Sequence, residues 1–216
     1  MTLRGIIFDL DGTLADTLPV CIQAFQETML HFNSRRPSDA EIISLFGPTE
    51  EGILETLLPE RRLDETLPCF LAEYARLHER LCRQLFPGVE NALSLLKANG
   101  IRMAIVSGKG QQSADISLRV LGLDRWIDCV ETGFADRPDK PRSIRKVLDH
   151  WKILPDQAAY VGDMPSDMQS ARQAGVLPLG AAWAESSTLH GGPDGQAAVM
   201  FYDIDSFIEW IKTVNE

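Results

Sequence analysis

The sequence predicts an α/β fold, in which helices cover both faces of an open parallel sheet and an all-helical segment is inserted near the start. Three observations predict it. Short apolar runs bounded by Gly, Asp or Ser are too brief for helices and fit buried strands. Helical apolar spacing lies between the later runs, and a long early stretch has helical patterns without a convincing strand. A chain of 216 residues is long enough for one large domain, or for one domain with a small insert.

Five apolar runs are the candidate strands. They lie at residues 5–8, 101–106, 127–130, 158–161 and 197–202. Helical spacing between them is shown by Val89, Ala92, Leu93 and Leu96, by Ile144, Val147, Leu148 and Trp151, and by the helix formers at residues 167–174. Strands that alternate with helices indicate a parallel sheet covered on both faces, which is the Rossmann-like arrangement.

Residues 17–86 are predicted to form an all-helical cap domain. One apolar helix face is made up of Leu67, Phe70, Leu71, Tyr74, Leu77 and Leu81. Ser38 and Glu41 have the spacing of a capping box that opens another helix. Because the first candidate strand precedes this segment and the others follow it, we expect residues 1–16 and 87–216 to form the α/β core domain.

The charge balance narrows the classes of partner. The chain has 31 acidic and 21 basic side chains, and its net charge of −10 argues against broad attraction to nucleic acid or anionic lipid. The first apolar run stops at Asp9, far short of the ~20 residues that span a bilayer. The four cysteines form no C-x-x-C pair, as is typical of reduced core thiols. We therefore expect a soluble, cytoplasmic protein that binds neither nucleic acid nor membrane.

Carboxylates follow two of the candidate strands. Asp9 and Asp11 come after the first, and their spacing of two directs both side chains to one side of an extended chain. Asp163 follows the strand at 158–161, with Asp167 four residues further on. Because parallel strands end at one edge of the sheet, these carboxylates are predicted to lie together. Such a cluster repels itself unless a cation neutralises it, and an all-oxygen site suits Mg²⁺.

A glycine-rich turn and a lysine complete the candidate site. The run Ser-Gly-Lys-Gly at residues 107–110 follows a strand and precedes a helical stretch. Its backbone N–H groups and the helix N-terminus are suited to hold a phosphate. Lys140, stiffened by Pro141, is a fixed cation that would offset the charge of that phosphate.

The same turn also nearly matches a dinucleotide-binding pattern. Gly108 and Gly110 are followed by Ser113, where a third small residue is expected, and Glu131 lies about as far on as a ribose-binding acid would. A nucleotide-binding fold therefore stays open as an alternative, although it gives the clustered aspartates no purpose.

The order of these motifs resembles that of the haloacid dehalogenase-like hydrolase superfamily. The resemblance rests on Asp-Leu-Asp-Gly-Thr-Leu at residues 9–14, the hydroxyl residue Ser107 after the second strand, Lys140-Pro141, and Val-Gly-Asp at residues 161–163 with Asp167. It covers residues 3 to about 180. It is nearest to the phosphoglycolate phosphatase-like branch, whose helical cap is inserted after the first motif.

The resemblance implies a role for each aspartate. Asp9 would be the nucleophile that forms an aspartyl phosphate, and it would also bind Mg²⁺. Asp11 would be the general acid and base, and its backbone carbonyl would complete the metal site. Asp163 would ligate the metal, with Asp167 lying behind the ligands.

The other motif residues would bind the phosphate. The resemblance implies that Ser107 and the Gly108 N–H hold phosphate oxygens, while Lys140 bridges phosphate and nucleophile. The chain is thus predicted to be a Mg²⁺-dependent phosphatase acting on a small phosphorylated metabolite. A phosphomutase acting on a sugar phosphate and a non-catalytic phosphate-binding module are the alternatives. Phosphoglycolate, a sugar phosphate, a nucleoside monophosphate and pyrophosphate all stay open as substrates.

Overall fold

The computed structural model describes residues 2–136, 138–189 and 197–214. These residues form a six-stranded, wholly parallel sheet with the strand order β3-β2-β1-β4-β5-β6. The strands are β1 (Gly5–Phe8), β2 (Arg102–Val106), β3 (Cys129–Glu131), β4 (Ala158–Gly162), β5 (Leu177–Ala181) and β6 (Val199–Phe201). The five strands expected from the apolar runs are all present, and β5 is an addition.

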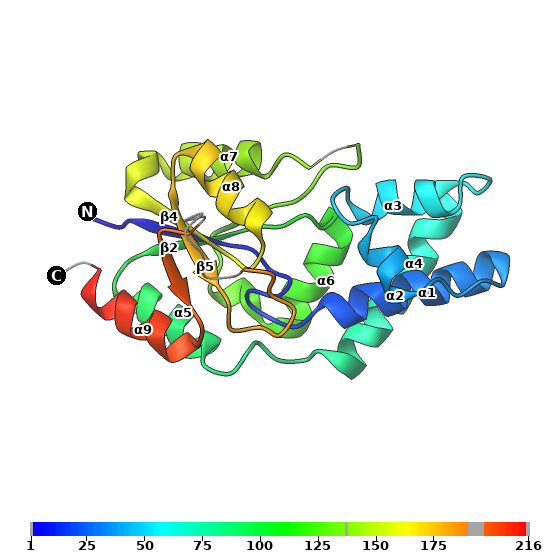
Figure 1. The fold of residues 1–216 in the computed structure, drawn as a ribbon, viewed down its shortest axis with the longest axis horizontal. Helices are drawn as coiled ribbons and strands as arrows, with labels where there is room; N and C mark the ends of the chain where they lie inside the picture. The colour runs from blue at the N-terminus through cyan, green and yellow to red at the C-terminus, as the bar shows by residue number, and fades with distance from the viewer. Residues whose placement is uncertain (1, 137, 190–196, 215–216) are drawn as a thin grey trace.

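Helices cover both faces of this sheet (Figure 1). They are α5 (Val89–Ala98), α6 (Gln111–Leu121), α7 (Lys140–Trp151), α8 (Pro165–Ala174) and α9 (Ile204–Thr213). Helices α7 and α8 pack together on one face, and α5 and α9 pack together on the other. Among the described residues, no helix combines the length and apolar character needed to cross a membrane.

The strand β1 is buried on both sides. Ile6 and Phe8 belong to the apolar layer that also contains residues of α5 and α9. Ile7 points the other way, into the layer formed with α7 and α8. Because neither face of the strand meets water, its sequence is an uninterrupted apolar run instead of an alternating one.

Four helices lie between β1 and α5, and we call them the helical lobe. They are α1 (Leu18–Asn33), α2 (Asp39–Ile43), α3 (Glu50–Leu57) and α4 (Leu63–Leu81). Figure 1 shows them gathered at one end of the molecule, beyond the sheet. The rings of Phe25 and Phe70 join α1 to α4, with centroids 4.5 Å apart. The expected capping box is present, because Ser38 and Glu41 exchange hydrogen bonds at the start of α2.

The sequence does not predict β5, because its run Leu-Pro-Leu-Gly-Ala contains two residues that weaken strand patterns. Pro178 is tolerated near the start of the strand, where its carbonyl still accepts a hydrogen bond from the Ala198 N–H (2.8 Å). A Cβ added at Gly180 would lie 2.3 Å from the sulfur of Met200 on β6. The glycine that obscures the strand in the sequence is therefore what lets β6 approach it.

Phe207 on α9 holds the outer part of the sheet through aromatic contacts. Its ring centroid lies 5.2 Å from that of Phe201, 5.8 Å from that of Trp183, 6.0 Å from that of Trp210 and 6.3 Å from that of Phe8. The side chain is 2% exposed. Removing it would leave a cavity that four rings line.

We expect Phe207→Ala to lower the free energy of unfolding by about 3–5 kcal/mol, the usual cost of removing a buried aromatic ring. Urea denaturation followed by circular dichroism measures this change. Tyr202→Ala is the control, because Tyr202 is 62% exposed, and it should change stability by no more than about 0.5 kcal/mol. Equal losses in the two variants would contradict the assignment of Phe207 as a packing centre.

Candidate active site

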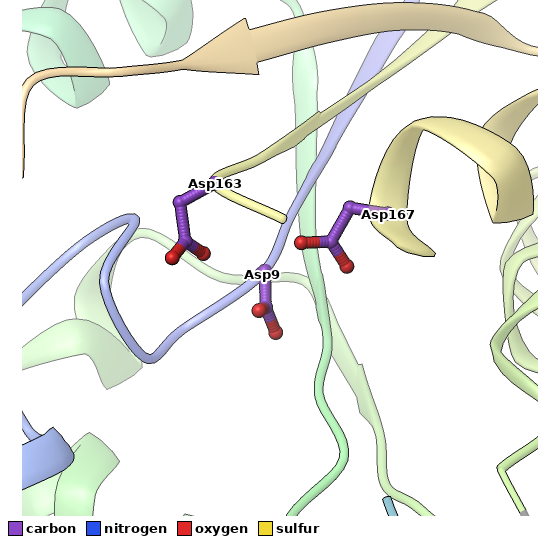
Figure 2. Close-up of side chains that lie close together, drawn as sticks. All are labelled: Asp9, Asp163 and Asp167. Carbon is purple, nitrogen blue, oxygen red and sulfur yellow. The ribbon is translucent and has the colours of Figure 1, made fainter. Parts of the chain in front are cut away.

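Three buried carboxylates converge at one edge of the sheet. Asp9 directly follows β1, Asp163 directly follows β4, and Asp167 lies in the first turn of α8. Figure 2 shows the three side chains close together, each coming from a different segment of the chain. One carboxylate oxygen from each lies within 4.8 Å of the others. The structure thus brings together three of the four aspartates that the sequence predicted at this edge, and the side chain of Asp11 is the exception.

Strand pairing and two glycines make this convergence fit. Strands β1 and β4 are parallel neighbours, and the Asp9 N–H donates to the Val161 carbonyl (2.8 Å). A Cβ at Gly12 would lie 2.4 Å from a carboxylate oxygen of Asp163, and one at Gly162 would lie 2.5 Å from the Cβ of Asp167. Any side chain at either glycine would therefore displace a carboxylate of the cluster.

Burial disfavours the charged forms of Asp9 and Asp163. Asp9 is 6% exposed, Asp163 4% and Asp167 0%. Loss of hydration raises the pKa of Asp9 well above its usual range, although Lys140 partly offsets the shift. Burial and the neighbouring Asp167 raise the pKa of Asp163 to about 7. A cation bound among these oxygens would relieve both effects.

Lys140 supplies one positive charge to the cluster. Its Nζ lies 2.6 Å from Asp167 Oδ1 and 3.2 Å from Asp9 Oδ2. Burial lowers the pKa of Lys140, but Asp167 and Asp9 outweigh that effect and keep the pKa well above its usual value. Because Lys140 is the first residue of α7 and Pro141 follows it, its backbone position is fixed by the start of the helix.

The remaining oxygens fit a bound divalent cation. Asp9 Oδ1 is buried and has no hydrogen-bond partner among the described residues. Asp163 Oδ1 accepts a hydrogen bond from the Thr13 hydroxyl at 3.1 Å. Both oxygens of Asp167 are engaged, Oδ1 with Lys140 and Oδ2 with the Met164 N–H (3.0 Å). Asp9 and Asp163 are therefore the better placed to hold a metal, and Asp167 fixes the lysine behind them.

Asp11 lies apart from this cluster. One of its side-chain oxygens, Oδ1, accepts a hydrogen bond from the Thr17 hydroxyl and forms an ion pair with Lys109 Nζ (3.1 Å). Its side chain is 27% exposed, more than the three clustered aspartates. The first two aspartates of the motif therefore have different surroundings. Asp9 lies among the buried carboxylates, whereas Asp11 lies toward the helical lobe.

Ser107 lies in the turn after β2, at the edge of the sheet where the aspartates converge, and it is buried. Ser107 is 1% exposed, its N–H donates to the Glu131 carbonyl (3.1 Å), and its Oγ accepts from the Lys109 N–H (3.3 Å). A Cβ added at Gly108 would meet nothing within 4 Å, so the backbone there faces open space. The Cβ side of Gly108 is thus open beside a buried hydroxyl, while its carbonyl lies against Gly133.

The start of α6 differs from the expectation, because a side chain of the lobe already occupies it. Glu50 accepts hydrogen bonds from the Gly110 N–H (2.5 Å) and from the Ser113 hydroxyl (2.6 Å). Burial raises the pKa of Glu50, and Lys109 opposes that shift. Glu131, the acid that the dinucleotide alternative needs, is paired with Lys146 at 2.8 Å. The two features on which that alternative depends are thus engaged within the chain.

Two residues of this site escaped the sequence analysis. Lys109 lies in the glycine-rich turn at residues 107–110, but nothing in the neighbouring sequence indicates that its side chain is buried and directed to Asp11. Glu50 lies at the start of a lobe helix and has no sequence signal at all, since its partners are about sixty residues away in the chain. The partial signal was the lysine itself, since a cation in a phosphate-binding turn is expected to face an anion.

Comparison with known proteins gives a consistent assignment. A family model described as haloacid dehalogenase-like hydrolase matches residues 6–181. The pyrophosphatase PpaX of Anoxybacillus flavithermus is 27% identical over 192 residues, which is 88% of this chain and 88% of that protein. A phosphoglycolate phosphatase of Aquifex aeolicus is 26% identical over 183 residues, covering 84% of this chain and 85% of that protein.

Solved structures share the fold. The crystal structure of CbbY from Rhodobacter sphaeroides in complex with phosphate superposes with a TM-score of 0.79 at 19% identity, covering 94% of this chain and 95% of that one. The family model takes in the strands from β1 to β5 and all three clustered aspartates. These findings confirm the resemblance of the motifs, and the chain belongs to the haloacid dehalogenase-like hydrolase family.

Proposed function

We propose that the chain is a Mg²⁺-dependent phosphatase that hydrolyses a small phosphorylated metabolite through an aspartyl phosphate on Asp9. The observation that carries the proposal is the ion pair of the partly buried Lys140 with the buried Asp9 and Asp167, beside an Asp9 oxygen that has no partner among the described residues. A carboxylate fixed by a lysine and left with a free oxygen is suited to attack a phosphorus atom. The two phosphatase-named relatives support the same reaction class.

The metal would be held by Asp9, Asp163 and the backbone carbonyl of Asp11. When bound, Mg²⁺ supplies the positive charge that lets a phosphate dianion enter a carboxylate cluster. Ser107, the Gly108 N–H and Lys140 would hold the phosphate oxygens. Because phosphoryl transfer depends mainly on positioning and charge stabilisation, these fixed donors provide most of what the reaction requires.

The chain's own residues then account for both chemical steps. An oxygen of Asp9 bonds to phosphorus as the bond to the leaving oxygen breaks, and protonated Asp11 gives its proton to that oxygen. In the second step Asp11 takes a proton from water, whose oxygen bonds to phosphorus as the bond to Asp9 breaks. Inorganic phosphate leaves, and Asp9 and Asp11 return to their starting forms.

The helical lobe would act as a lid over this site. The lobe joins the sheet and its covering helices, which we call the sheet domain, through two connections near residues 16–18 and 86–88. It lies at the edge of the sheet that carries Asp9. The lobe also contacts the sheet domain directly, through a hydrogen bond from the Thr49 N–H to the Phe134 carbonyl (3.1 Å). A Cβ at Gly52 would lie only 2.1 Å from the Ala135 carbonyl oxygen. Closure would exclude water and bring specificity residues over the substrate.

Activity should require Mg²⁺, because without a metal the carboxylates of Asp9 and Asp163 repel the phosphate dianion. We expect phosphate release to stop in excess chelator and to return when excess Mg²⁺ is added. Ca²⁺ should substitute poorly, since it accepts looser and higher coordination. Full turnover in chelator would contradict the metal requirement.

Asp9→Asn should abolish formation of the phosphoenzyme, because the amide cannot act as the nucleophile. Asp11→Asn should retain phosphate binding and lose about 10²- to 10⁴-fold in turnover, the usual contribution of a proton-transfer group. Rapid quench with a radiolabelled substrate measures both. Substrates with good leaving groups, such as p-nitrophenyl phosphate, should recover much of the first step in Asp11→Asn and none in Asp9→Asn.

The control for these variants is Asp149→Asn, an exposed change on α7 that should leave turnover unaltered. A phosphoryl group trapped on Asp11 instead of Asp9 would reverse the assignment. Transfer of phosphate between sugar positions without net release would show a phosphomutase.

Gly52→Ala should hinder closure of the lobe, because the new methyl group would strike the backbone at Ala135 and α3 would have to move away. We expect kcat/KM to fall by roughly 10- to 100-fold, as is typical when a catalytic arrangement shifts by about an ångström. Glu55→Ala, an exposed change on the same helix, is the control. Unchanged kcat/KM in a stably folded Gly52→Ala protein would show that closure at this contact is not needed.

A further inference from the structure

Lys109 is buried between two carboxylates, and it takes no part in the two chemical steps proposed for Asp9 and Asp11. Its Nζ lies 3.1 Å from Asp11 Oδ1 and 3.9 Å from Glu50 Oε1, and the residue is 5% exposed. The ammonium group also stands over the ring of Tyr74, 4.7 Å from its centroid. Asp11 and Lys109 belong to the sheet domain, whereas Glu50 and Tyr74 come from the lobe. One ammonium group therefore links the proton-transfer carboxylate to a carboxylate of the lobe.

Glu50 fills a place that is suited to an anion. Its carboxylate accepts from the Gly110 N–H and the Ser113 hydroxyl at the start of α6, a helix whose N-cap offers no side-chain cap of its own. A helix N-terminus beside a buried lysine is an environment that binds phosphate or carboxylate groups. The chain's own carboxylate occupies it; burial raises the pKa of Glu50, while Lys109, the Ser113 hydroxyl and the Gly110 N–H oppose that shift by stabilising the charged form.

Negative charge exceeds positive charge around this lysine. Asp11 and Glu50 both contact this ammonium group, and Glu51 lies beside Glu50 at Gly110. Two carboxylates therefore remain against one ammonium group even when Asp11 carries the proton for the first step. A Cβ at Gly110 would lie 2.7 Å from an oxygen of Glu51 and 3.0 Å from one of Glu50. Glu51 Oε2 is buried and accepts no hydrogen bond from the described residues. A second anion would be repelled here, because charges interact strongly away from water, whereas a hydroxyl group could donate to these oxygens.

We propose that Glu50 selects the substrate by charge, so that phosphate esters with uncharged, hydroxyl-bearing leaving groups are preferred over those with a second carboxylate or phosphate. This inference rests on the proposed function, because the leaving oxygen must reach Asp11 to receive its proton and so brings the leaving group beside Lys109. Pyrophosphate and phosphoglycolate, the substrates that the names of the two relatives denote, both carry a second anionic group. The specificity of this chain is therefore expected to differ from theirs.

The test uses two substrates that differ at one end only. Glycerol 3-phosphate and 3-phosphoglycerate share a three-carbon skeleton, but the second has a carboxylate where the first has a hydroxymethyl group. With the full chain and Mg²⁺, we expect kcat/KM for glycerol 3-phosphate to exceed that for 3-phosphoglycerate by roughly tenfold or more, since like charges brought together in a buried site are costly.

Glu50→Gln tests the residue itself. Glutamine keeps an oxygen that can accept from the Gly110 N–H, but it removes the charge. We expect the preference to fall by roughly tenfold, mainly through a lower KM for 3-phosphoglycerate, because the charge repulsion acts on binding. Glu55→Gln, an exposed change on the same helix, should keep the wild-type preference. A merely structural role for Glu50 would lower both activities together and leave their ratio unchanged.

The outcomes separate this inference from the proposed function. A wild-type preference for 3-phosphoglycerate, or an unaltered ratio in a Glu50→Gln protein with wild-type melting temperature, overturns the role of Glu50. Absence of phosphate release from p-nitrophenyl phosphate overturns the proposed function instead. In that event calorimetric binding of the two compounds decides the inference, and equal binding to the wild-type and Glu50→Gln proteins overturns it.

Discussion

The candidate site depends on the ion pairs that Lys140 forms with Asp9 and Asp167. Three carboxylates buried within a few ångströms of one another would otherwise repel, and burial raises the pKa of Asp9 and Asp163, which disfavours the charged forms of these two. Lys140 contacts two of them, and the start of α7 fixes it there. Lys140 thereby neutralises part of the negative charge, and the remaining carboxylate oxygens form a group that could hold a metal ion.

The sheet order places these charges with little freedom. Strand β1 lies between β2 and β4, so the segments after all three strands meet at one edge. Burial of β1 on both faces keeps that edge rigid, since the apolar layers on either side hold the strand in register. Gly12 and Gly162 then allow the aspartates to approach one another. A catalytic arrangement needs such rigidity, because small displacements of reacting groups are costly in rate.

The sequence predicts the parts of this structure that depend on local signals. Strand β1, the aspartates after it and the helix that carries Ile144 and Val147 all follow from apolar runs and spacing, although the sequence placed Lys140 just before that helix and the structure makes it the first residue. Strand β5 is not predicted, because Pro178 and Gly180 obscure its pattern and the reason for the glycine is a contact with a strand about twenty residues later. The pairing of Glu50 with Lys109 is missed for the same reason, since it exists only once the lobe has packed on the sheet domain.

Two lysines, the buried Lys109 and the partly buried Lys140, contact different aspartates of the candidate site. Lys140 joins Asp9 and Asp167, which all belong to the sheet domain, whereas Lys109 joins Asp11 to Glu50 of the lobe. A change in the lobe can therefore alter the charge beside Asp11 without touching Asp9 and Asp163, the carboxylates best placed to hold a metal. Proteins that share this sheet can then keep one phosphate chemistry while their substrates diverge. Because Asp11 contacts the lysine shared with the lobe, a change at Glu50 would act on the aspartate that we propose for proton transfer.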